Sequence, residues 1–220
     1  MTDAKETRFD FEREARIGLP EAIFCEGKTV AQIDAILDSA GERGVGVLLT
    51  RLNPDQNKAL RHRLDYDSLS RTGLFGDHPA VTTAANIAIV TAGTADLPVA
   101  RETARTLAFF GLASTEIADV GVAGLWRLLE RTEELRRFPL LICIAGMEGA
   151  LFSVLAGLVP GMVIAVPTSR GYGVARGGET ALHAALTGCA PGVLVTNIDN
   201  GYGAACAARR MLLNAPRLLK

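Results

Sequence analysis

The chain has 220 residues, 49% of them hydrophobic and 21% charged, which is enough for one globular domain or one domain with a small appendage. Because the formal net charge is only −1, no overall field favours nucleic acid or an anionic membrane, and we expect neither as a partner. The charged start and the short apolar runs predict neither an export signal nor a membrane span, so we expect a cytoplasmic protein. The four cysteines should then be reduced thiols, and the three histidines show no spacing for structural zinc.

Residues 1–80 predict a small α/β region that packs on the main domain or is swapped between copies of it. Thr29 is a candidate N-cap for a helix that ends near Arg43, and Asn53 or Asp55 opens a second helix. A turn-rich stretch, SRTGLFGDHPAVTT, closes this region, so we expect the domain boundary within residues 72–85 and divide the chain after residue 80. Two strands are expected, over Ala22–Glu26 and Val45–Leu49.

Residues 81–220 predict the main domain, a catalytic nucleotide-binding α/β domain. Four short, almost continuously apolar runs alternate with helix-like stretches, and such runs are typical of strands buried on both faces of a parallel sheet. The alternation indicates right-handed crossovers and a doubly wound, mostly parallel sheet with helices on both faces. The strands are expected at 86–91, 139–145, 162–167 and 192–198, with a weaker candidate at 115–120, and the helices at 97–110, 124–135, 150–158 and 179–186.

Ligands of an open parallel sheet bind outside the carboxyl ends of its strands, and the first two loops there carry candidate groups. In AGTADLP (92–98), Gly93 allows close backbone approach, Thr94 offers a hydroxyl and Asp96 suits a helix start. This loop is either a phosphate cradle or a plain capped turn. In AGMEGA (145–150), Glu148 lies between glycines in an apolar tract. We interpret it as a general acid or base, with an acid that complements the helix dipole as the alternative.

The third and fourth loops are also rich in glycine. PTSRGYGVARGG (167–178) adds two arginines, a serine and a threonine, and we interpret it as a lid over a phosphorylated ligand rather than a plain surface loop. NIDNGYGA (197–204) ends a predicted strand. Its Asp199 and Asn200 can hydrogen-bond a ribose or orient a metal-bound water, or they can simply cap the next helix.

Cys189 differs from the other cysteines. It lies in TGCAPG, between a helix and a strand, where a loop can expose a thiol. Cys25, Cys143 and Cys206 fall in apolar or alanine-rich segments that we expect to be core. For an isolated cysteine an inert thiol is the commoner case, and no base beside Cys189 is identified by the sequence.

Six long motifs are spread over both halves of the chain: GLPEAIFCEGKT (18–29), TAGTADLPVA (91–100), DVGVAGL (119–125), AGMEGAL (145–151), VIAVPTSRGYG (163–173) and CAPGVLVTNIDNGYGA (189–204). Together, and in this order, they resemble the carboxylases of nickel-pincer-nucleotide biosynthesis, the family of the B maturation protein for lactate racemase. That family is related to the aminoimidazole ribonucleotide (AIR) carboxylases and mutases.

The resemblance implies an AIR-carboxylase-like three-layer fold and a pyridinium-3,5-biscarboxylic acid mononucleotide synthase. Such an enzyme carboxylates C5 of the pyridinium ring of nicotinic acid adenine dinucleotide with carbon dioxide or bicarbonate and releases AMP. It implies Cys189 as the thiolate nucleophile and Glu148 as the group that takes the C5 proton. It also implies magnesium, with Asp199 as a candidate ligand, no tightly bound organic cofactor, and a homo-oligomer, an octamer in related carboxylases. The expected substrate-binding residues are Gly93, Thr94, Asp96, Gly146, Met147, Thr168, Ser169, Gly171, Tyr172, Asp199, Asn200 and Gly201.

Three residues depart from the family's pattern: Arg170 and Arg176 add charge to the third loop, and Phe152 stands where proline is usual. Two alternative functions are a true AIR carboxylase or mutase, which uses no thiolate, and a nucleotide-binding module without turnover. The Ser-Ala-His-Arg stretch of the first is replaced here by Asp119–Gly124, which holds no histidine. The presence of both Cys189 and Glu148 argues against the second.

Overall fold

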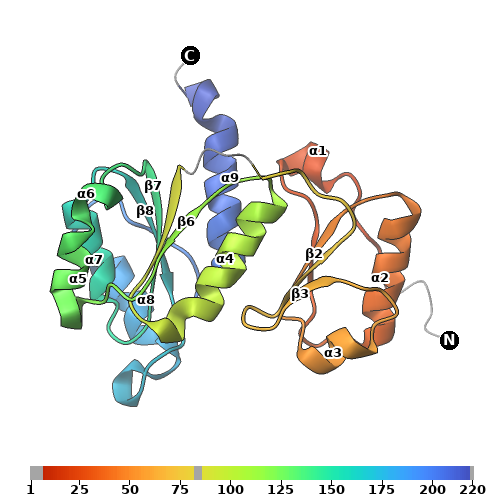
Figure 1. Cartoon of the computed structure of the whole chain (residues 1–220), viewed down its shortest axis with the longest axis horizontal. Helices are drawn as coiled ribbons and strands as arrows, with labels where there is room; N and C mark the ends of the chain where they lie inside the picture. The colour runs from red at the N-terminus through yellow and green to blue at the C-terminus, as the bar shows by residue number, and fades with distance from the viewer. Residues whose placement is uncertain (1–6, 82–85, 219–220) are drawn as a thin grey trace.

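The protein was analysed as a computed structural model that describes residues 7–81 and 86–218, with side chains as far as residue 215. Two sheets lie side by side, with helix α4 (Leu97–Phe109) between them (Figure 1). Residues 82–85, which belong to the predicted boundary region, lie outside the described residues. Within the two described ranges, no helix combines the length and the apolar character needed to cross a membrane.

The C-terminal sheet has parallel strands in the order β6-β5-β7-β8-β9. This order is that of a doubly wound, flavodoxin-like sheet, and it confirms the predicted fold class. Three central strands match the predicted apolar runs: β5 (Ile87–Thr91), β7 (Leu140–Ala145) and β8 (Met162–Pro167). They are almost entirely buried because helices cover both faces of the sheet.

The two edge strands are short. The weaker strand candidate, at 115–120, forms β6 (Thr115–Ile117). The strand predicted over 192–198 is limited to β9 (Leu194–Val195). As an edge strand, β9 pairs only with β8, and the chain then turns into the fourth loop. Single backbone bonds from Thr196 to Ala165 and from Asp199 to Pro167 hold that loop beside β8.

Helices on both faces complete the layers (Figure 1). α4 and α9 (Gly201–Leu218) cover one face, and α7 (Ala150–Leu158) and α8 (Glu179–Thr187) cover the other together with α5 (Leu125–Glu130) and α6 (Thr132–Leu135). The single helix predicted over 124–135 is therefore wrong. The segment instead begins with a 3-10 turn, η2 (Val122–Gly124), and is divided into α5 and α6 at Arg131, whose ψ of 1° is not helical.

The N-terminal sheet is mixed, with the order β1-β2-β4-β3, and α1 (Arg13–Ile17) precedes it. β1 (Ala22–Phe24) and β2 (Val47–Thr50) confirm the two predicted strands. The antiparallel pair β3 (Asp65–Asp67) and β4 (Thr72–Phe75) was not predicted, because the glycine in β4 reads as a turn signal. Gly73 is there for packing, since a Cβ at this position would lie 2.9 Å from the Leu64 side chain.

The capping signals of this domain are confirmed. The Thr29 hydroxyl accepts the backbone N–H of Gln32 at 3.2 Å at the start of α2 (Val30–Glu42). Asn53, rather than Asp55, caps α3 (Pro54–Ala59), because its side chain accepts the backbone N–H of Gln56 at 2.8 Å.

α4 joins the two domains. Leu48 and Leu74 of the N-terminal sheet belong to the same buried cluster as Leu107 of α4. On the polar side of the contact, Arg105 of α4 donates to the Thr72 hydroxyl at 2.8 Å and to the Asp65 carbonyl at 2.6 Å. The N-terminal region thus packs on the main domain of its own chain, which was one of the two expected arrangements.

Gly201, a predicted substrate-binding residue, has a packing role where α9 meets α4. A Cβ there would lie 2.6 Å from both the Thr103 hydroxyl and the Val99 carbonyl, both on α4. We therefore expect Gly201→Ala to lower the free energy of unfolding by about 1–3 kcal/mol, measured by urea denaturation. Gly157→Ala is the matched control, because no atom lies within 4 Å of its Cβ position and alanine favours the helix by about 0.5–1 kcal/mol. Equal stabilities of the two variants would contradict this role.

Candidate functional site

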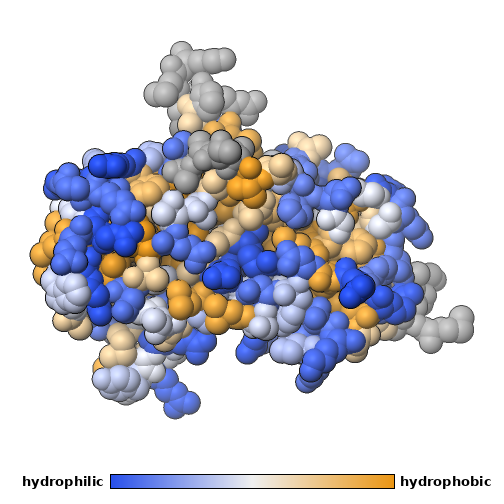
Figure 2. Space-filling model, in the orientation of Figure 1, coloured by the Kyte–Doolittle hydropathy of each residue, from blue (hydrophilic) through white to orange (hydrophobic). Residues whose placement is uncertain are grey.

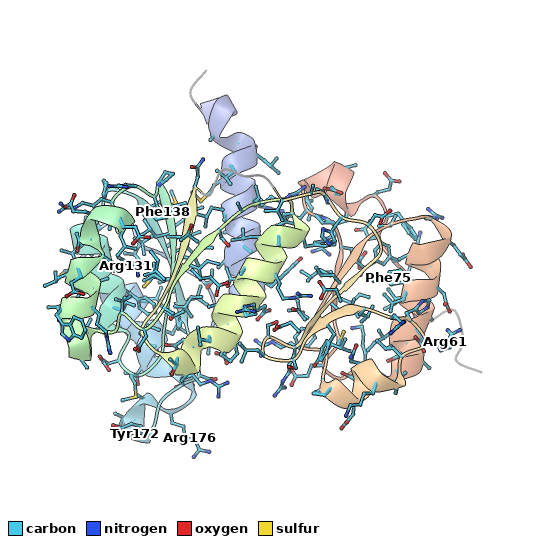
Figure 3. The ribbon with its side chains drawn as sticks, in the orientation of Figure 1. Arg61, Phe75, Arg131, Phe138, Tyr172 and Arg176 are labelled. Atoms are coloured by element: carbon cyan, nitrogen blue, oxygen red, sulfur yellow. The ribbon has the colours of Figure 1, made fainter. Side chains whose placement is uncertain are left out.

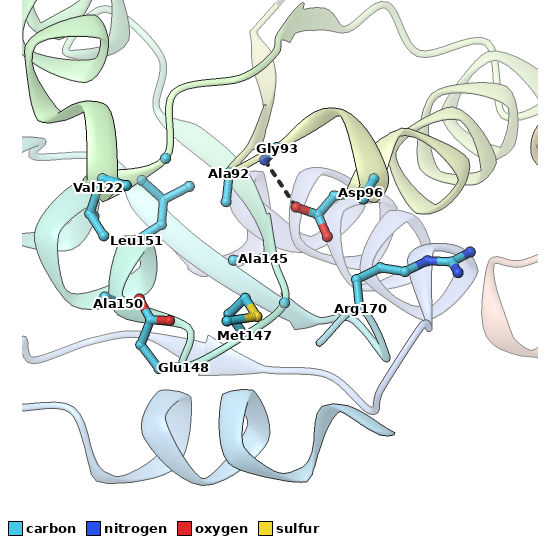
Figure 4. A pocket seen from close by; sticks show the side chains of 14 residues that line it. Ala92, Gly93, Asp96, Val122, Ala145, Met147, Glu148, Ala150, Leu151 and Arg170 are labelled. Atoms are coloured by element: carbon cyan, nitrogen blue, oxygen red, sulfur yellow. Dashed lines mark hydrogen bonds between the residues drawn. The ribbon is translucent and has the colours of Figure 1, made fainter. Parts of the chain in front are cut away.

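The candidate site that holds Glu148 is a crevice at the carboxyl edge of the C-terminal sheet. β5 and β7 are neighbours, and the helices that follow them leave on opposite faces, so their loops diverge and open a space between them. This space, here called the Glu148 cavity, has a volume of about 340 Å³. The residues shown in Figure 4 line it: Ala92, Gly93, Ala95, Asp96, Gly121, Val122, Ala123, Ala145, Gly146, Met147, Glu148, Ala150, Leu151 and Arg170.

Two glycines let the loops around this cavity approach one another. A Cβ on Gly146 would lie 2.1 Å from the carbonyl oxygen of Arg170, and one on Gly121 would lie 2.6 Å from that of Ala92. The backbone N–H of Met147 donates to the same Arg170 carbonyl at 2.7 Å, with Met147 itself at a φ of 50°. The second and third loops are therefore tied together, and Gly146 serves as a close-approach residue.

Asp96 connects two of the loops around the cavity through its carboxylate. Its carboxylate is buried, accepts the Thr168 hydroxyl at 2.7 Å, and accepts the backbone N–H of Gly93 at 3.0 Å. Burial raises the pKa of Asp96 above its usual range, while the Thr168 and Gly93 hydrogen bonds oppose that rise. Asp96 thus links the first loop to the third, and Thr168 contacts Asp96 without itself lining the cavity.

Glu148 lines the cavity on the side opposite Asp96 (Figure 4). Its side chain is exposed in the single chain, and the cavity that it lines is formed mainly by apolar residues and glycines. Gly149, the next residue, carries no side chain that would cover it and precedes α7 with a left-handed φ of 65°. The carboxylate is therefore accessible to a ligand in the cavity.

Several other predicted binding residues lie outside this cavity. Thr94 is exposed on the 3-10 turn η1 (Thr94–Asp96). Gly171 packs closely under the 3-10 helix η3 (Gly173–Gly178), and Tyr172 is 77% exposed and projects from the body with Arg176 (Figure 3). Asn200 caps α9, since its side chain accepts the backbone N–H of Gly203 at 2.8 Å, which was the structural alternative for this residue.

Ser169 and Asp199 line a second cavity of about 220 Å³, here called the interdomain cavity. The Asp199 carboxylate accepts the backbone N–H of Ser169 at 2.9 Å, so the third and fourth loops are joined here. Three charged residues of this cavity were missed in the sequence: Arg51 and Arg71 from the N-terminal domain and Glu102 from α4. Glu102 is three residues after Val99 and four before Thr106, so all three share one face of α4, and that face is buried. This spacing was the available signal that Glu102 faces inward.

Glu102 is only 6% exposed, and burial raises its pKa to about 7 from an ordinary value of 4.5. The positive charge of Arg51 and the backbone N–H of Tyr202 oppose that rise, and the charge of Asp199 adds to it.

This shift predicts a pH dependence of stability. Because the folded-state pKa lies above the unfolded one, the contribution of Glu102 is complete below about pH 4.5 and is lost as the pH rises through about 7. Glu102→Gln should remove this slope and be more stable than the wild type at pH 8 by at most about 3 kcal/mol. Urea denaturation between pH 4 and 8 measures it, with the exposed Glu179→Gln as control. An unchanged slope in Glu102→Gln would contradict the assignment.

The cysteines divide as predicted. Cys25, Cys143 and Cys206 are buried, and burial raises the pKa of the Cys25 thiol to about 12, so these thiols are protonated core groups. Cys189 is exposed in the loop between α8 and β9. It lines neither of the two cavities in this chain, so the structure does not bring it together with Glu148.

The described residues do not fit a metal centre made by protein ligands alone. Among them, no group of three or more His, Cys, Asp or Glu side chains could hold a metal ion. Magnesium usually takes one or two carboxylates together with substrate phosphates and water, which leaves Asp199 as a candidate ligand only in the presence of a substrate.

Comparison with known proteins connects this site to a family. A sequence model described as "AIR carboxylase" matches residues 86–219, and one described as "LarB/PurE-like N-terminal domain" matches residues 1–76. A relative from Methanocaldococcus jannaschii, "Uncharacterized protein MJ0165", is 34% identical over 208 residues, which cover 90% of this chain and 80% of the relative. The crystal structure of Treponema denticola PurE2-S38D shares 19% identity with a TM-score of 0.45, over 65% of this chain and 95% of that chain.

The chain is therefore a carboxylase-type enzyme that belongs to the AIR carboxylase family. Its N-terminal domain further places it in the LarB branch of that family.

Proposed function

We propose that this enzyme carboxylates C5 of the pyridinium ring of nicotinic acid adenine dinucleotide and cleaves the phosphoanhydride, releasing AMP. The observation that carries the proposal is a carboxylate, Glu148, in a cavity that contains no histidine. All three histidines are within the described residues, and none of them lines the Glu148 cavity. The segment that would hold the Ser-Ala-His-Arg stretch of an AIR carboxylase contributes only Gly121, Val122 and Ala123, which cannot transfer a proton.

The proposed chemistry begins with the Cys189 thiolate. A pyridinium ring is too electron-poor to attack carbon dioxide, but addition of the thiolate at C4 gives a neutral dihydropyridine whose C5 is nucleophilic. C5 then forms a bond to the carbon of carbon dioxide, and the C5 proton passes to Glu148. Loss of the thiolate from C4 restores the aromatic ring. In a separate step, water cleaves the phosphoanhydride to give AMP and the biscarboxylated mononucleotide.

The position of Cys189 makes a homo-oligomer part of the proposal. The thiol lies outside the cavity of its own chain, and a neighbouring copy would bring it, or the surface around it, to the substrate. Exposed apolar side chains are available for such contacts. Leu186 and Leu194, on either side of the Cys189 loop, are 63% and 48% exposed. Trp126 on α5 is 62% exposed, and hydrophobic residues lie among hydrophilic ones on the surface at the α5 end of the molecule (Figure 2).

One assay tests the proposal: incubation of the protein with nicotinic acid adenine dinucleotide, magnesium and bicarbonate, followed by mass spectrometry. We expect AMP and a mononucleotide heavier than nicotinic acid mononucleotide by one carboxyl group. Consumption of aminoimidazole ribonucleotide instead would favour the purine-pathway reaction. Binding without AMP release would favour a module without turnover.

A further inference from the structure

The interdomain cavity lies beside the Glu148 cavity, and Arg170 lines both of them. In Figure 4 its guanidinium points away from Glu148 and Met147. We propose that the interdomain cavity binds the diphosphate of the substrate through the guanidinium groups of Arg51, Arg71 and Arg170. This inference rests on the proposed dinucleotide substrate, and it makes the N-terminal domain a part of the substrate site.

The first observation in favour of a diphosphate ligand is the positive charge that lines the cavity. Arg51 comes from the end of β2, Arg71 from the start of β4, and Arg170 from the loop after β8. None of these three guanidinium groups forms an ion pair with a carboxylate of the described residues, whereas eight other arginines do. Three guanidinium groups without a carboxylate partner outnumber the two carboxylates of the cavity, Glu102 and Asp199, and favour a multiply charged anion.

The second observation is the backbone conformation of three residues that line the cavity. Arg51, Arg71 and Asp199 have φ values of 55°, 54° and 54°, and all three line the cavity. Residues other than glycine rarely adopt this left-handed conformation, and such strain collects at ligand sites. Hydrogen bonds also connect the segments that carry these three residues. Leu52 donates its N–H to the Arg71 carbonyl at 2.9 Å, and Arg51 Nη2 donates to the Asp199 carbonyl at 2.6 Å.

The remaining wall fits a phosphate linked to a sugar. Glu102 is almost completely buried yet lines the cavity, and the Asp199 carboxylate lies on the same wall. These oxygens can accept ribose hydroxyl groups beside the phosphates. A volume of about 220 Å³ is below the range of about 300–1,000 Å³ typical of whole small-molecule sites, so the cavity suits a diphosphate bridge with the nucleosides on either side.

The test is isothermal titration calorimetry on the full chain, with four variants: Arg71→Gln, Arg51→Gln, Arg71→Lys and Arg63→Gln. The last is the matched control, an exposed arginine of the same domain that lines neither cavity. The ligands are nicotinic acid adenine dinucleotide, inorganic pyrophosphate and nicotinic acid mononucleotide. Thermal melting confirms that each variant is folded.

We expect Arg71→Gln and Arg51→Gln each to weaken binding of the dinucleotide and pyrophosphate about 10- to 100-fold, as loss of a charge-assisted hydrogen bond predicts. Binding of the mononucleotide should change less than about 3-fold, Arg71→Lys should recover part of the loss, and Arg63→Gln should match the wild type. Unchanged dinucleotide affinity in both glutamine variants, equal losses for dinucleotide and mononucleotide, or no dinucleotide binding by the wild type would overturn the inference.

The same samples separate this inference from the proposed function. Arginine-dependent dinucleotide binding without carboxylation by the wild type would support the diphosphate site and reject the proposed reaction. Carboxylation with an unchanged KM for the dinucleotide in both glutamine variants would reject the diphosphate site and support the reaction.

Discussion

Replacing Cys189 with alanine should lower the rate of carboxylation by a factor of about 10⁴, because loss of a covalent nucleophile removes the pathway that it opens. Affinity for the dinucleotide should change little, because the thiolate acts in the covalent step and the proposed contacts to the diphosphate come from other residues. The rate is measured by mass spectrometry of the carboxylated mononucleotide, and the affinity by calorimetry.

The protein contains its own control for this experiment. Cys206 is buried on α9, so Cys206→Ala makes the same chemical change at a thiol that the proposed reaction does not use. That variant should keep its turnover. Because Cys189 is the exposed cysteine, brief alkylation with iodoacetamide should modify it first and abolish turnover in parallel. Full activity of Cys189→Ala would reject the thiolate mechanism.

Replacing Glu148 with glutamine should lower kcat by about 10²- to 10³-fold, the range typical of a lost general base. Glutamine keeps the shape of the side chain but cannot take the C5 proton, so KM for the dinucleotide should stay within a few-fold. Glu179→Gln, at an exposed position on α8 outside both cavities, is the control and should be unaffected.

A substrate deuterated at C5 identifies the step that Glu148 serves. If Glu148 takes this proton, its loss should become rate-limiting in Glu148→Gln, and a primary isotope effect should appear or increase. A fall in kcat without any change in the isotope effect would assign Glu148 to another step. A rise in KM alone would make it a binding residue.

Features set by neighbouring residues could be predicted from the sequence. Thr29 and Asn53 cap their helices because the side chain and the N–H that it accepts are three residues apart, a distance that the chain itself imposes. The buried parallel strands follow from continuous apolar runs, and their shared direction brings the loops of Gly93, Gly146 and Glu148 to one sheet edge. Position along the chain is sufficient for these features.

Contacts between distant segments required the tertiary structure. Strand β4 forms where a glycine-containing stretch looks like a turn, because Gly73 fits beneath Leu64 in the folded sheet. Arg51 donates to the carbonyl of Asp199 across 148 residues of sequence, and no local pattern encodes that contact. The sequence by itself determined the α/β fold, the caps and the loops of the Glu148 cavity. Only the tertiary structure decided that Arg51, Arg71 and Glu102 surround one cavity and that Cys189 lies outside it, because packing between domains sets those distances.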